Sequence, residues 1–291
     1  MSTLQKAEAA VWIASYPKSG NTWVQSVIRH AGRAYGFPDG DLDVYKLIAD
    51  KRAPQIVRGV RPRVTKDPVT VLKTHAAYPS DGRLHPALRL STAGFVYVMR
   101  NPLDMLLSYI NFTRQQFEKR KDSAEYQQRL FIELLGFERA YSFDEWQQIT
   151  LEDIPRDNLD HALKRFTEQK TMVPGMSGVA GGSWLSHCKS WHEARAQMPS
   201  VFLRYEDLLE DAGGFLALQK IFKFSDDEIL SAVAAVNEKQ RGMQYKVVFF
   251  NKMASYYFTQ FFSPSCIKDF LDAMEPELRE LGYDNLRGVP A

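Results

Sequence analysis

Four short apolar runs along the chain have the pattern of buried β-strands. Each run is almost continuously apolar and rich in β-branched or aromatic residues, and does not alternate between apolar and polar positions. This pattern is typical of a parallel sheet that helices cover on both faces. The sequence therefore predicts four buried strands, at Val11–Ser15, Val69–Leu72, Phe95–Met99 and Val201–Leu203.

The segments between these runs carry apolar residues at helical spacing. They predict helices at Thr22–Tyr35, Leu103–Lys119, Trp184–Gln197 and Phe215–Phe222. Strands that alternate with helices are joined by right-handed crossovers, so the order predicts an α/β fold with three layers (α/β/α) around a central parallel sheet. The sequence shows no internal repeat and no low-complexity linker, and we expect a single domain over residues 1–291.

Two regions are less regular than the rest. Arg114–Arg129 is highly charged, and Leu151–Gly182 begins with an acidic, polar stretch and closes with a run rich in glycine. Segments of this kind form solvated helices and loops, and in a ligand-binding enzyme they also serve as lids over the substrate. Both interpretations remain open from the sequence.

Composition and charge narrow the class of protein. A hydrophobic content of 45% with 25% charged residues is typical of a soluble globular protein, and a net charge of +2 does not indicate a nucleic-acid or membrane partner. Cys188 and Cys266 have no metal or redox spacing, which favours a reducing compartment. Met1–Ala10 has no signal-peptide core, and no apolar run reaches the ~20 residues that span a bilayer. We therefore expect a cytoplasmic protein without a membrane span.

The segment after the first predicted strand has the composition of a phosphate-binding loop. A helix is predicted to begin at about Thr22, and a helix N-terminus offers unpaired N–H groups and a positive dipole end to an anion. Lys18 adds a mobile charge, Gly20 lets the backbone approach closely, and Thr22 supplies a hydroxyl donor. Trp23 offers a flat surface to a nucleobase. The loop therefore predicts nucleotide binding.

The spacing of this loop differs from that of the common P-loop. G-x-x-x-x-G-K-[ST] places lysine after its last glycine, whereas Lys18 precedes Gly20. The segment Tyr16-Pro-Lys-Ser-Gly-Asn-Thr-Trp23 instead resembles the 5′-phosphosulfate-binding loop of the cytosolic-type sulfotransferases, which use 3′-phosphoadenosine 5′-phosphosulfate (PAPS). Their usual loop, Y-P-K-S-G-T-T-W, differs only at Asn21. The resemblance implies that the co-substrate is bound by Lys18, Ser19, Gly20, Asn21, Thr22 and Trp23.

A second motif, Lys73-Thr74-His75, follows the second predicted strand. Ligands in open α/β sheets bind beyond the carboxyl ends of the strands, so these side chains are expected to face the nucleotide crevice. A neutral imidazole can take a hydroxyl proton, and Lys73 lies on the same face of the extended chain as His75. The motif resembles the K-T-H of the same family, whose histidine deprotonates the acceptor. The resemblance implies catalytic roles for His75, Lys18 and Lys73.

A third motif begins at Arg100, where the third predicted strand ends. Arg100 offers a planar fork to a terminal phosphate, and Ser108 lies on the helix that follows. The segment matches every fixed position of the family's 3′-phosphate pattern, R-N-x-x-D-x-x-x-S-Y. The resemblance implies that Arg100 and Ser108 bind the 3′-phosphate, while the residues alone leave open an ordinary ion pair between Arg100 and Asp104.

Two segments near the fourth predicted strand also resemble family motifs. Gly182–Arg195 resembles G-S-W…W-x-E-A-R, and Tyr205–Asp207 matches Y-E-D. The resemblance implies that Tyr205 lies against the adenine, and a plain core tyrosine is the alternative. Val236 stands where the family often has phenylalanine, so it can pack on a base but cannot stack with it.

The last family motif is where the chain departs most from the pattern. In Phe249–Ser263 the family's R-K-G is replaced by Asn251, Lys252 and Met253. Lys252 keeps a charge for the 3′-phosphate, and Asn251 keeps a hydrogen-bond donor. The aromatic residues of this segment also suit core packing or a wall of the acceptor site. The family's dimer motif is not matched, so the oligomeric state stays open.

The motifs occur in family order from about Val11 to about Ser263. The resemblance implies a P-loop-like sulfotransferase fold and transfer of a sulfuryl group from PAPS to a hydroxyl or amine. The acceptor is expected to be a small phenol, alcohol or natural product, the product 3′-phosphoadenosine 5′-phosphate (PAP), and no metal is required.

Two alternatives come from other classes of protein. A nucleotide kinase of related fold would need Mg²⁺-directing aspartates and a Walker loop, which the sequence does not contain. A non-catalytic nucleotide-binding protein would not need Lys18, Lys73 and His75 together. The joint presence of these three residues favours the transferase.

Overall fold

The computed structural model describes residues 9–35, 69–79, 90–120, 122–170, 183–243, 255–284 and 286. The chain divides into two compact units. The first comprises Met1–Arg100 with Ser186–Met243, and the second comprises Asn101–Leu185 with Gln244–Ala291. The expectation of a single domain over the whole chain stays a prediction.

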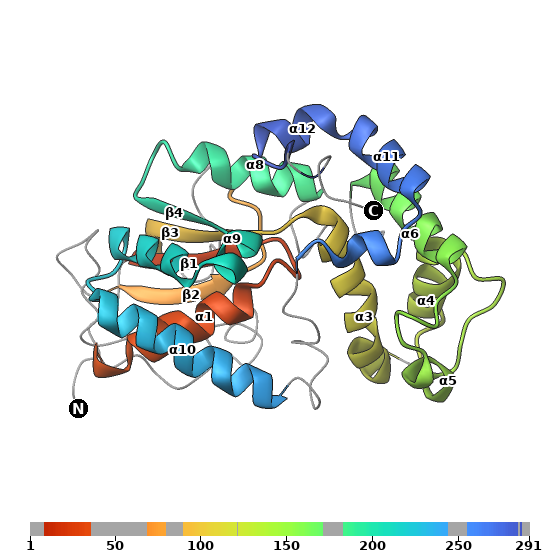
Figure 1. Cartoon of the computed structure of the whole chain (residues 1–291), viewed down its shortest axis with the longest axis horizontal. Helices are drawn as coiled ribbons and strands as arrows, with labels where there is room; N and C mark the ends of the chain where they lie inside the picture. The colour runs from red at the N-terminus through yellow and green to blue at the C-terminus, as the bar shows by residue number, and fades with distance from the viewer. Residues whose placement is uncertain are drawn as a thin grey trace. The chain divides into compact units, whose positions relative to one another are not determined.

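The first unit contains a parallel four-stranded sheet (Figure 1). Its strands are β1 (Ala9–Ser15), β2 (Thr70–Thr74), β3 (Ser91–Met99) and β4 (Ser200–Arg204), in the order β2-β1-β3-β4. All four predicted strands are confirmed, and every neighbouring pair is parallel. The second was predicted too short, because pairing with β1 continues past Leu72 to Lys73 and Thr74.

Helices cover both faces of this sheet. On one face α8 (Trp184–Ala194) brings Trp191 against the rings of Phe95 and Tyr97, at centroid distances of 4.8 and 5.9 Å. The chain moves from β1 to β2 and then in the opposite direction to β3, so right-handed crossovers place α1 (Asn21–Ala31) on the other face. There α10 (Asp226–Met243) packs beside α1 (Figure 1). The predicted α/β layering is confirmed.

The predicted helices differ from the observed ones mainly at their ends. The first prediction ran to Tyr35, but α1 ends at Ala31 and a separate 3₁₀ turn follows at Arg33–Tyr35. Between β4 and α10 lies the short helix α9 (Tyr205–Glu210). The α-helix predicted at Phe215–Phe222 is wrong, because a 3₁₀ helix occupies Ala212–Lys220. Gly213 and Gly214 lie in the first turn of this segment and are weak α-helix formers, so a tighter winding replaces the α-helix.

The second unit is helical over its described residues. Its elements are α3 (Pro102–Arg120), α4 (Ala124–Gln127), a π-helical segment (Gln128–Leu134), α5 (Phe143–Gln148), α6 (Arg156–Gln169), a 3₁₀ turn (Tyr257–Gln260), α11 (Pro264–Ala273) and α12 (Glu275–Glu280). The predicted helix at Leu103–Lys119 is therefore confirmed as α3. The irregular region that begins at Leu151 contains a regular helix, α6.

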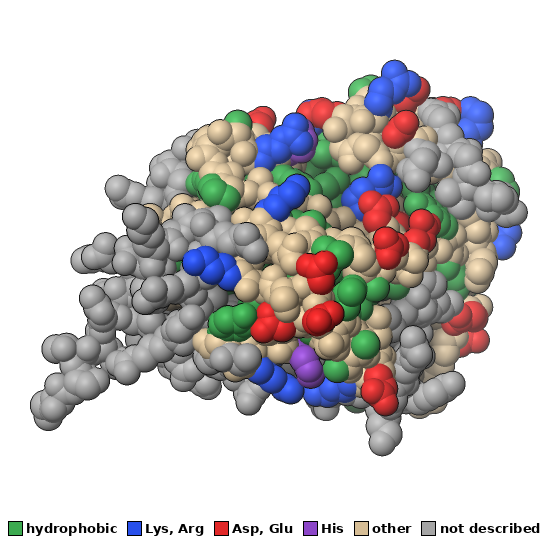
Figure 2. Space-filling view, turned by 60° about the vertical axis from the view of Figure 1, so that its left-hand side comes forward, with side chains coloured by type: hydrophobic (Ala, Val, Ile, Leu, Met, Phe, Trp, Pro, Cys, Tyr) green, Lys and Arg blue, Asp and Glu red, His purple; other side chains and the backbone are tan. Residues whose placement is uncertain are grey.

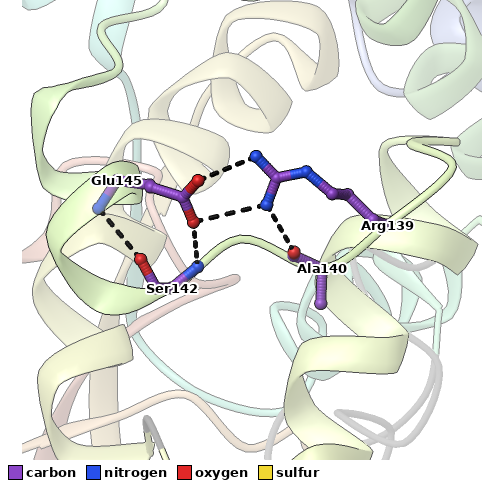
Figure 3. Close-up of polar contacts among 4 residues, drawn as sticks. All are labelled: Arg139, Ala140, Ser142 and Glu145. Atoms are coloured by element: carbon purple, nitrogen blue, oxygen red, sulfur yellow. Dashed lines mark hydrogen bonds and ion pairs between the residues drawn. The ribbon is translucent and has the colours of Figure 1, made fainter.

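A capping box begins α5 (Figure 3). The Glu145 N–H donates to Ser142 Oγ over 3.3 Å, and the Ser142 N–H donates to the Glu145 carboxylate over 2.8 Å. Arg139 donates to the same carboxylate over 2.8 and 3.3 Å. These hydrogen bonds, that of Arg139 first, lower the pKa of Glu145 to about 2. Local sequence thus fixes where this helix begins.

The first turn of α3 contains a buried carboxylate, Asp104. It accepts hydrogen bonds from Asn101 Nδ2 over 2.9 Å, from the Tyr256 N–H over 2.6 Å and from the Phe258 N–H over 3.0 Å. The Tyr257 hydroxyl donates to the Asp104 carbonyl oxygen over 3.0 Å. Asp104 therefore anchors Tyr256–Phe258 to the start of α3.

Charged side chains of both signs are interspersed on the face shown in Figure 2. This mixture agrees with a net charge of +2 for the whole chain. Within the described ranges, no helix has both the length and the apolar character that crossing a membrane requires.

Candidate functional site

The carboxyl ends of the four strands carry the main predicted site residues of the first unit. Lys18 follows β1, His75 follows β2, Arg100 follows β3, and Tyr205 follows β4. Because β2 and β3 lie on opposite sides of β1, the chain leaves the sheet in opposite directions at this edge. Such a switch point is where open α/β sheets bind ligands. The sheet thus brings together residues from four distant parts of the sequence.

The loop between β1 and α1 has the backbone of an anion-binding turn. Lys18 has φ 70° and Gly20 has φ 97°, both in the left-handed region that contributes to anion-binding nests. The Trp23 and Val24 N–H groups donate to the Gly20 carbonyl oxygen, over 3.0 and 3.3 Å. Because α1 begins at Asn21, no helix carbonyl lies one turn earlier to accept hydrogen bonds from the Asn21 and Thr22 N–H groups. A phosphate at this turn meets N–H donors and the positive end of the α1 dipole.

Two cations, Arg100 and Lys73, act electrostatically on Lys18 at this edge. Burial first, and then the charges of Arg100 and Lys73, together lower the pKa of Lys18 from 10.5 to about 7. Arg100 is 7% exposed, and its Nη1 donates to the Lys18 carbonyl oxygen over 3.3 Å. An anion among these groups would relieve their mutual repulsion. The electrostatics therefore favour a bound anion beside Lys18.

His75 has the geometry of a neutral base. Its Nδ1 lies 2.8 Å from the Ser15 carbonyl oxygen, and because a carbonyl only accepts, Nδ1 carries the proton. The lone pair is therefore on Nε2, which is the atom that can take a proton from a substrate. Burial first, then the charge of Lys73 and, less strongly, that of Lys18 together lower the pKa of His75 to about 3, against the opposing effect of the hydrogen bond to Ser15. The ring is neutral at physiological pH.

Helix α8 holds the backbone that carries His75. His187 Nε2 donates to the His75 carbonyl oxygen over 3.2 Å, and Trp191 Nε1 donates to that of Ala76 over 3.0 Å. His187 is fully buried, burial lowers its pKa to about 3, and its Nδ1 lies 2.8 Å from the Tyr97 hydroxyl. Sequence reasoning assigned no role to His187, because only the tertiary fold brings it to this backbone.

The aromatic residues of the site form one cluster. The Tyr205 ring lies edge-on to Trp23 at a centroid distance of 5.5 Å, and the Arg100 guanidinium carbon lies 4.2 Å from the Tyr205 ring centre. A Cβ on Gly20 would lie 2.5 Å from Tyr205 Cδ2, so only glycine fits beneath this ring. Trp23 is 4% exposed, and its indole N–H donates to Asn237 Oδ1 over 2.9 Å. Base recognition by Trp23 and Tyr205 stays a prediction.

The remaining predicted site residues have varied positions. Ser19 is buried, Thr22 is half-buried in the first turn of α1, and Val236 is buried on α10. Ser108 is half-buried on α3, which belongs to the second unit, so its predicted partnership with Arg100 is untested. Asn251 and Lys252 lie outside the described residues.

Asn21 was predicted to bind the co-substrate, and this stays a prediction; its side chain hydrogen-bonds to groups at the strand ends. It is 3% exposed, and its Nδ2 lies 3.1 Å from the Ile13 carbonyl oxygen and 3.0 Å from Ser15 Oγ. Over the described ranges the structure contains no group of three or more His, Cys, Asp or Glu side chains that could hold a metal ion.

Two solved structures share this fold. The mouse sulfotransferase SULT7A1, solved in complex with PAP, has a TM-score of 0.54 and 17% identity, with 97% of this chain and 90% of the mouse chain covered. A retinol dehydratase, solved with retinol and PAP, has a TM-score of 0.50 and 15% identity, with 94% and 82% covered. At these identities the likeness establishes the fold.

Curated relatives match the sequence over part of their length. Rat sulfotransferase 1E1 is 23% identical over 208 residues, which are 68% of this chain and 53% of the relative. Dog sulfotransferase 1B1 is 27% identical over 235 residues, which are 76% of this chain and 62% of the relative. The chain thus spans roughly half to two thirds of the length of these relatives.

The family comparison covers more of the chain than these pairwise matches. The sequence profile of the sulfotransferase domain matches residues 8–281, a range that includes the phosphate loop, the K-T-H motif and the Arg100 motif. The chain therefore belongs to the sulfotransferase domain family.

Proposed function

We propose that this protein transfers a sulfuryl group from PAPS to a hydroxyl or amine of a small-molecule acceptor. The observation that carries the proposal is the meeting of Lys18, Lys73 and Arg100 with a neutral His75 at one edge of a parallel sheet. Membership of the sulfotransferase family supports it, as do the two structures of the same fold that were solved with PAP.

The residues of this edge suit the charges of PAPS. The loop N–H groups, Thr22 and Lys18 would hold the 5′-phosphosulfate, since together they offer hydrogen-bond donors, a helix dipole and a cation. Arg100 would bind the 3′-phosphate through its guanidinium fork. Participation of Ser108 and of Lys252 in the same phosphate site is part of the proposal, and so is adenine contact by Trp23, Tyr205 and Val236.

His75 acts as the general base in this proposal. The acceptor O–H or N–H gives its proton to His75 Nε2 while the acceptor atom bonds to sulfur and the bond from sulfur to the 5′-phosphate oxygen breaks. The bonding electrons leave on that phosphate oxygen, and PAP departs. Anionic groups near His75 favour its protonated form, so bound PAPS would raise the low pKa of the imidazole toward a useful range.

Lys18 and Lys73 stabilise the charge that develops during transfer. The charges of both lysines lower the pKa of His75, so both act electrostatically on the region where the acceptor proton is removed. Positioning and charge neutralisation would supply most of the catalysis, as in phosphoryl transfer. We expect the acceptor to be a small phenol, an alcohol or a natural product. We also expect the protein to work in the cytoplasm.

Nucleotide binding and transfer test the proposal together. We expect PAP to raise the melting temperature more than ADP does, with no effect of EDTA, and labelled sulfate to pass from PAPS to at least one acceptor in a panel of phenols, alcohols, amines and sugars. Lys18→Met should abolish the PAP shift. Lys268→Met, at an exposed α11 residue paired with Asp272, should keep it.

Three results would contradict the proposal. Equal stabilisation by ADP that EDTA removes would indicate a nucleotide kinase. Stabilisation by PAP without transfer to any acceptor class would indicate a non-catalytic nucleotide-binding protein. The absence of any PAP effect would exclude the assigned nucleotide site.

A further inference from the structure

The amide of Asn21 joins the two strand ends that carry the site. Its Nδ2 lies 3.0 Å from Ser15 Oγ and 3.1 Å from the Ile13 carbonyl oxygen, both at the end of β1, and 3.5 Å from the Thr74 carbonyl oxygen at the end of β2. Carbonyl oxygens only accept hydrogen bonds, so the nitrogen of the amide must face the strands. Asn21 therefore connects β1 to the residue that immediately precedes His75.

Ser15, which accepts a hydrogen bond from Asn21, also accepts one from the His75 ring. His75 Nδ1 lies 2.8 Å from the Ser15 carbonyl oxygen and 3.3 Å from Ser15 Oγ. Asn21 thus contacts both sides of one interaction: Ser15, whose carbonyl oxygen accepts from the ring, and, over the longest of its three contacts, the carbonyl oxygen of Thr74, the residue that precedes His75. The side chains of Ser15, Asn21 and Thr74 are buried and that of His75 is half-buried, so water cannot readily replace these bonds.

Loss of this connection would alter the proton position on His75. The hydrogen bond to the Ser15 carbonyl oxygen places the proton on Nδ1 and leaves the Nε2 lone pair exposed to a substrate proton. If the ring is released from that carbonyl, the tautomer with the proton on Nε2 becomes populated, and that tautomer has no lone pair at the working atom. The side-chain amide of Asn21 can therefore control activity without itself contacting either substrate.

We propose that Asn21 is a positioning residue that fixes the orientation and tautomer of His75 through Ser15 and Thr74. The catalytic consequence rests on the proposed role of His75 as the base, but the tautomer itself does not. The loop usual in the family has threonine at this position, and a threonine has a single hydroxyl donor. It cannot serve the Ile13 carbonyl and Ser15 Oγ at the same time.

The tautomer can be measured directly by NMR on protein labelled with ¹⁵N at histidine. In the wild type we expect the His75 signal, assigned by its loss in His75→Gln, to show a protonated Nδ1 and an unprotonated Nε2. Asn21→Ala should shift this signal toward the other tautomer, and Asn21→Thr should give a smaller shift in the same direction. Gln25→Ala should leave it unchanged, because Gln25 is a buried amide one turn further along α1 whose Nε2 has no hydrogen-bond partner.

The effects of these variants on enzyme kinetics should follow the same pattern as their effects on the NMR signal. In Asn21→Ala we expect kcat for sulfuryl transfer to fall by about 10-fold to 100-fold, with PAP affinity within about threefold of the wild type. In a Ser15→Ala background the same change should cost clearly less, because the two residues act through one contact. Melting curves identify the variants that fold, and Asn21→Thr supplies the test if Asn21→Ala does not.

An unchanged His75 tautomer in folded Asn21 variants would overturn the proposal. So would a loss of PAP affinity in place of kcat, which would make Asn21 a nucleotide ligand. Near-normal turnover of His75→Gln would contradict the proposed base but leaves the tautomer measurement valid, so the two failures are distinguishable.

Discussion

The low pKa of Lys18 makes nucleotide binding depend on pH in a definite direction. Burial, Arg100 and Lys73 lower this pKa from 10.5 to about 7 in the protein without nucleotide. A bound phosphate favours the charged amine and raises the pKa again, so binding above pH 7 must take up a proton. Affinity for PAP should therefore fall as the pH rises.

The size of the effect follows from the two pKa values. With a pKa of about 7, the charged fraction of Lys18 is about one half at pH 7 and about one hundredth at pH 9. If bound phosphate restores the ordinary pKa, binding takes up about 0.9 proton at pH 8, and affinity falls about 50-fold from pH 7 to pH 9. The nucleotide contributes little to this change, because its phosphates have their second pKa near ~6.

Isothermal titration of PAP measures both quantities. The slope of the observed enthalpy against the ionisation enthalpy of the buffer gives the number of protons taken up. Lys18→Arg is the matched control, because a guanidinium stays charged throughout this range and should remove the proton uptake and most of the pH dependence. Equal affinity at pH 7 and pH 9 with no proton uptake in the wild type would refute the argument.

Three further predictions concern stability. Gly20→Ala should destabilise the fold by about 1–3 kcal/mol and weaken PAP binding, because φ is 97° there and a Cβ would contact an aromatic ring at 2.5 Å; unchanged melting and affinity would contradict this. Asp104→Ala should cost about 3–5 kcal/mol in chemical denaturation, since it leaves two buried N–H donors and one part-buried N–H donor without their acceptor, and a loss below about 1 kcal/mol would be inconsistent with it. Acid should unfold the protein early, because burial lowers the pKa of both His75 and His187 from 6.5 to about 3. The unfolded chain binds more protons in that window, so stability is full above pH 6.5 and falls toward pH 3 by about 1.4 kcal/mol per pH unit for each histidine. A variant that lacks His187 should show a shallower slope, and equal slopes would contradict the assignment.

The strands were predictable from the sequence because both faces of the sheet are covered. A continuous apolar run such as Val11–Ser15 has few other structures available to it, and the chain order of such runs limits the topology. Their ends were less predictable, because main-chain pairing carries β2 past its apolar run into Lys73 and Thr74. Helix α10 was not predicted, although Ser225 and Glu228 at its start exchange the hydrogen bonds of a capping box, which is a local signal.

The candidate site was predictable only in part for a related reason. Lys18, His75 and Arg100 stand at strand ends, and strand ends of a parallel sheet meet at one edge, so motif and topology together place them. The orientation of Asn21 had no signal in the sequence, because an amide in a basic loop fits a phosphate ligand equally well. Its inward turn depends on carbonyl oxygens of β1 and β2, which only the folded chain brings together.

Single-turnover transfer from PAPS by the variant His75→Gln tests the central claim most directly. Loss of the base should lower the rate by about 10²–10⁴-fold, while the affinity for PAP stays within about threefold of the wild type. His161→Gln, which changes a histidine of α6 in the second unit, is the matched control and should transfer normally. A His75→Gln protein that transfers at nearly the wild-type rate would contradict the account.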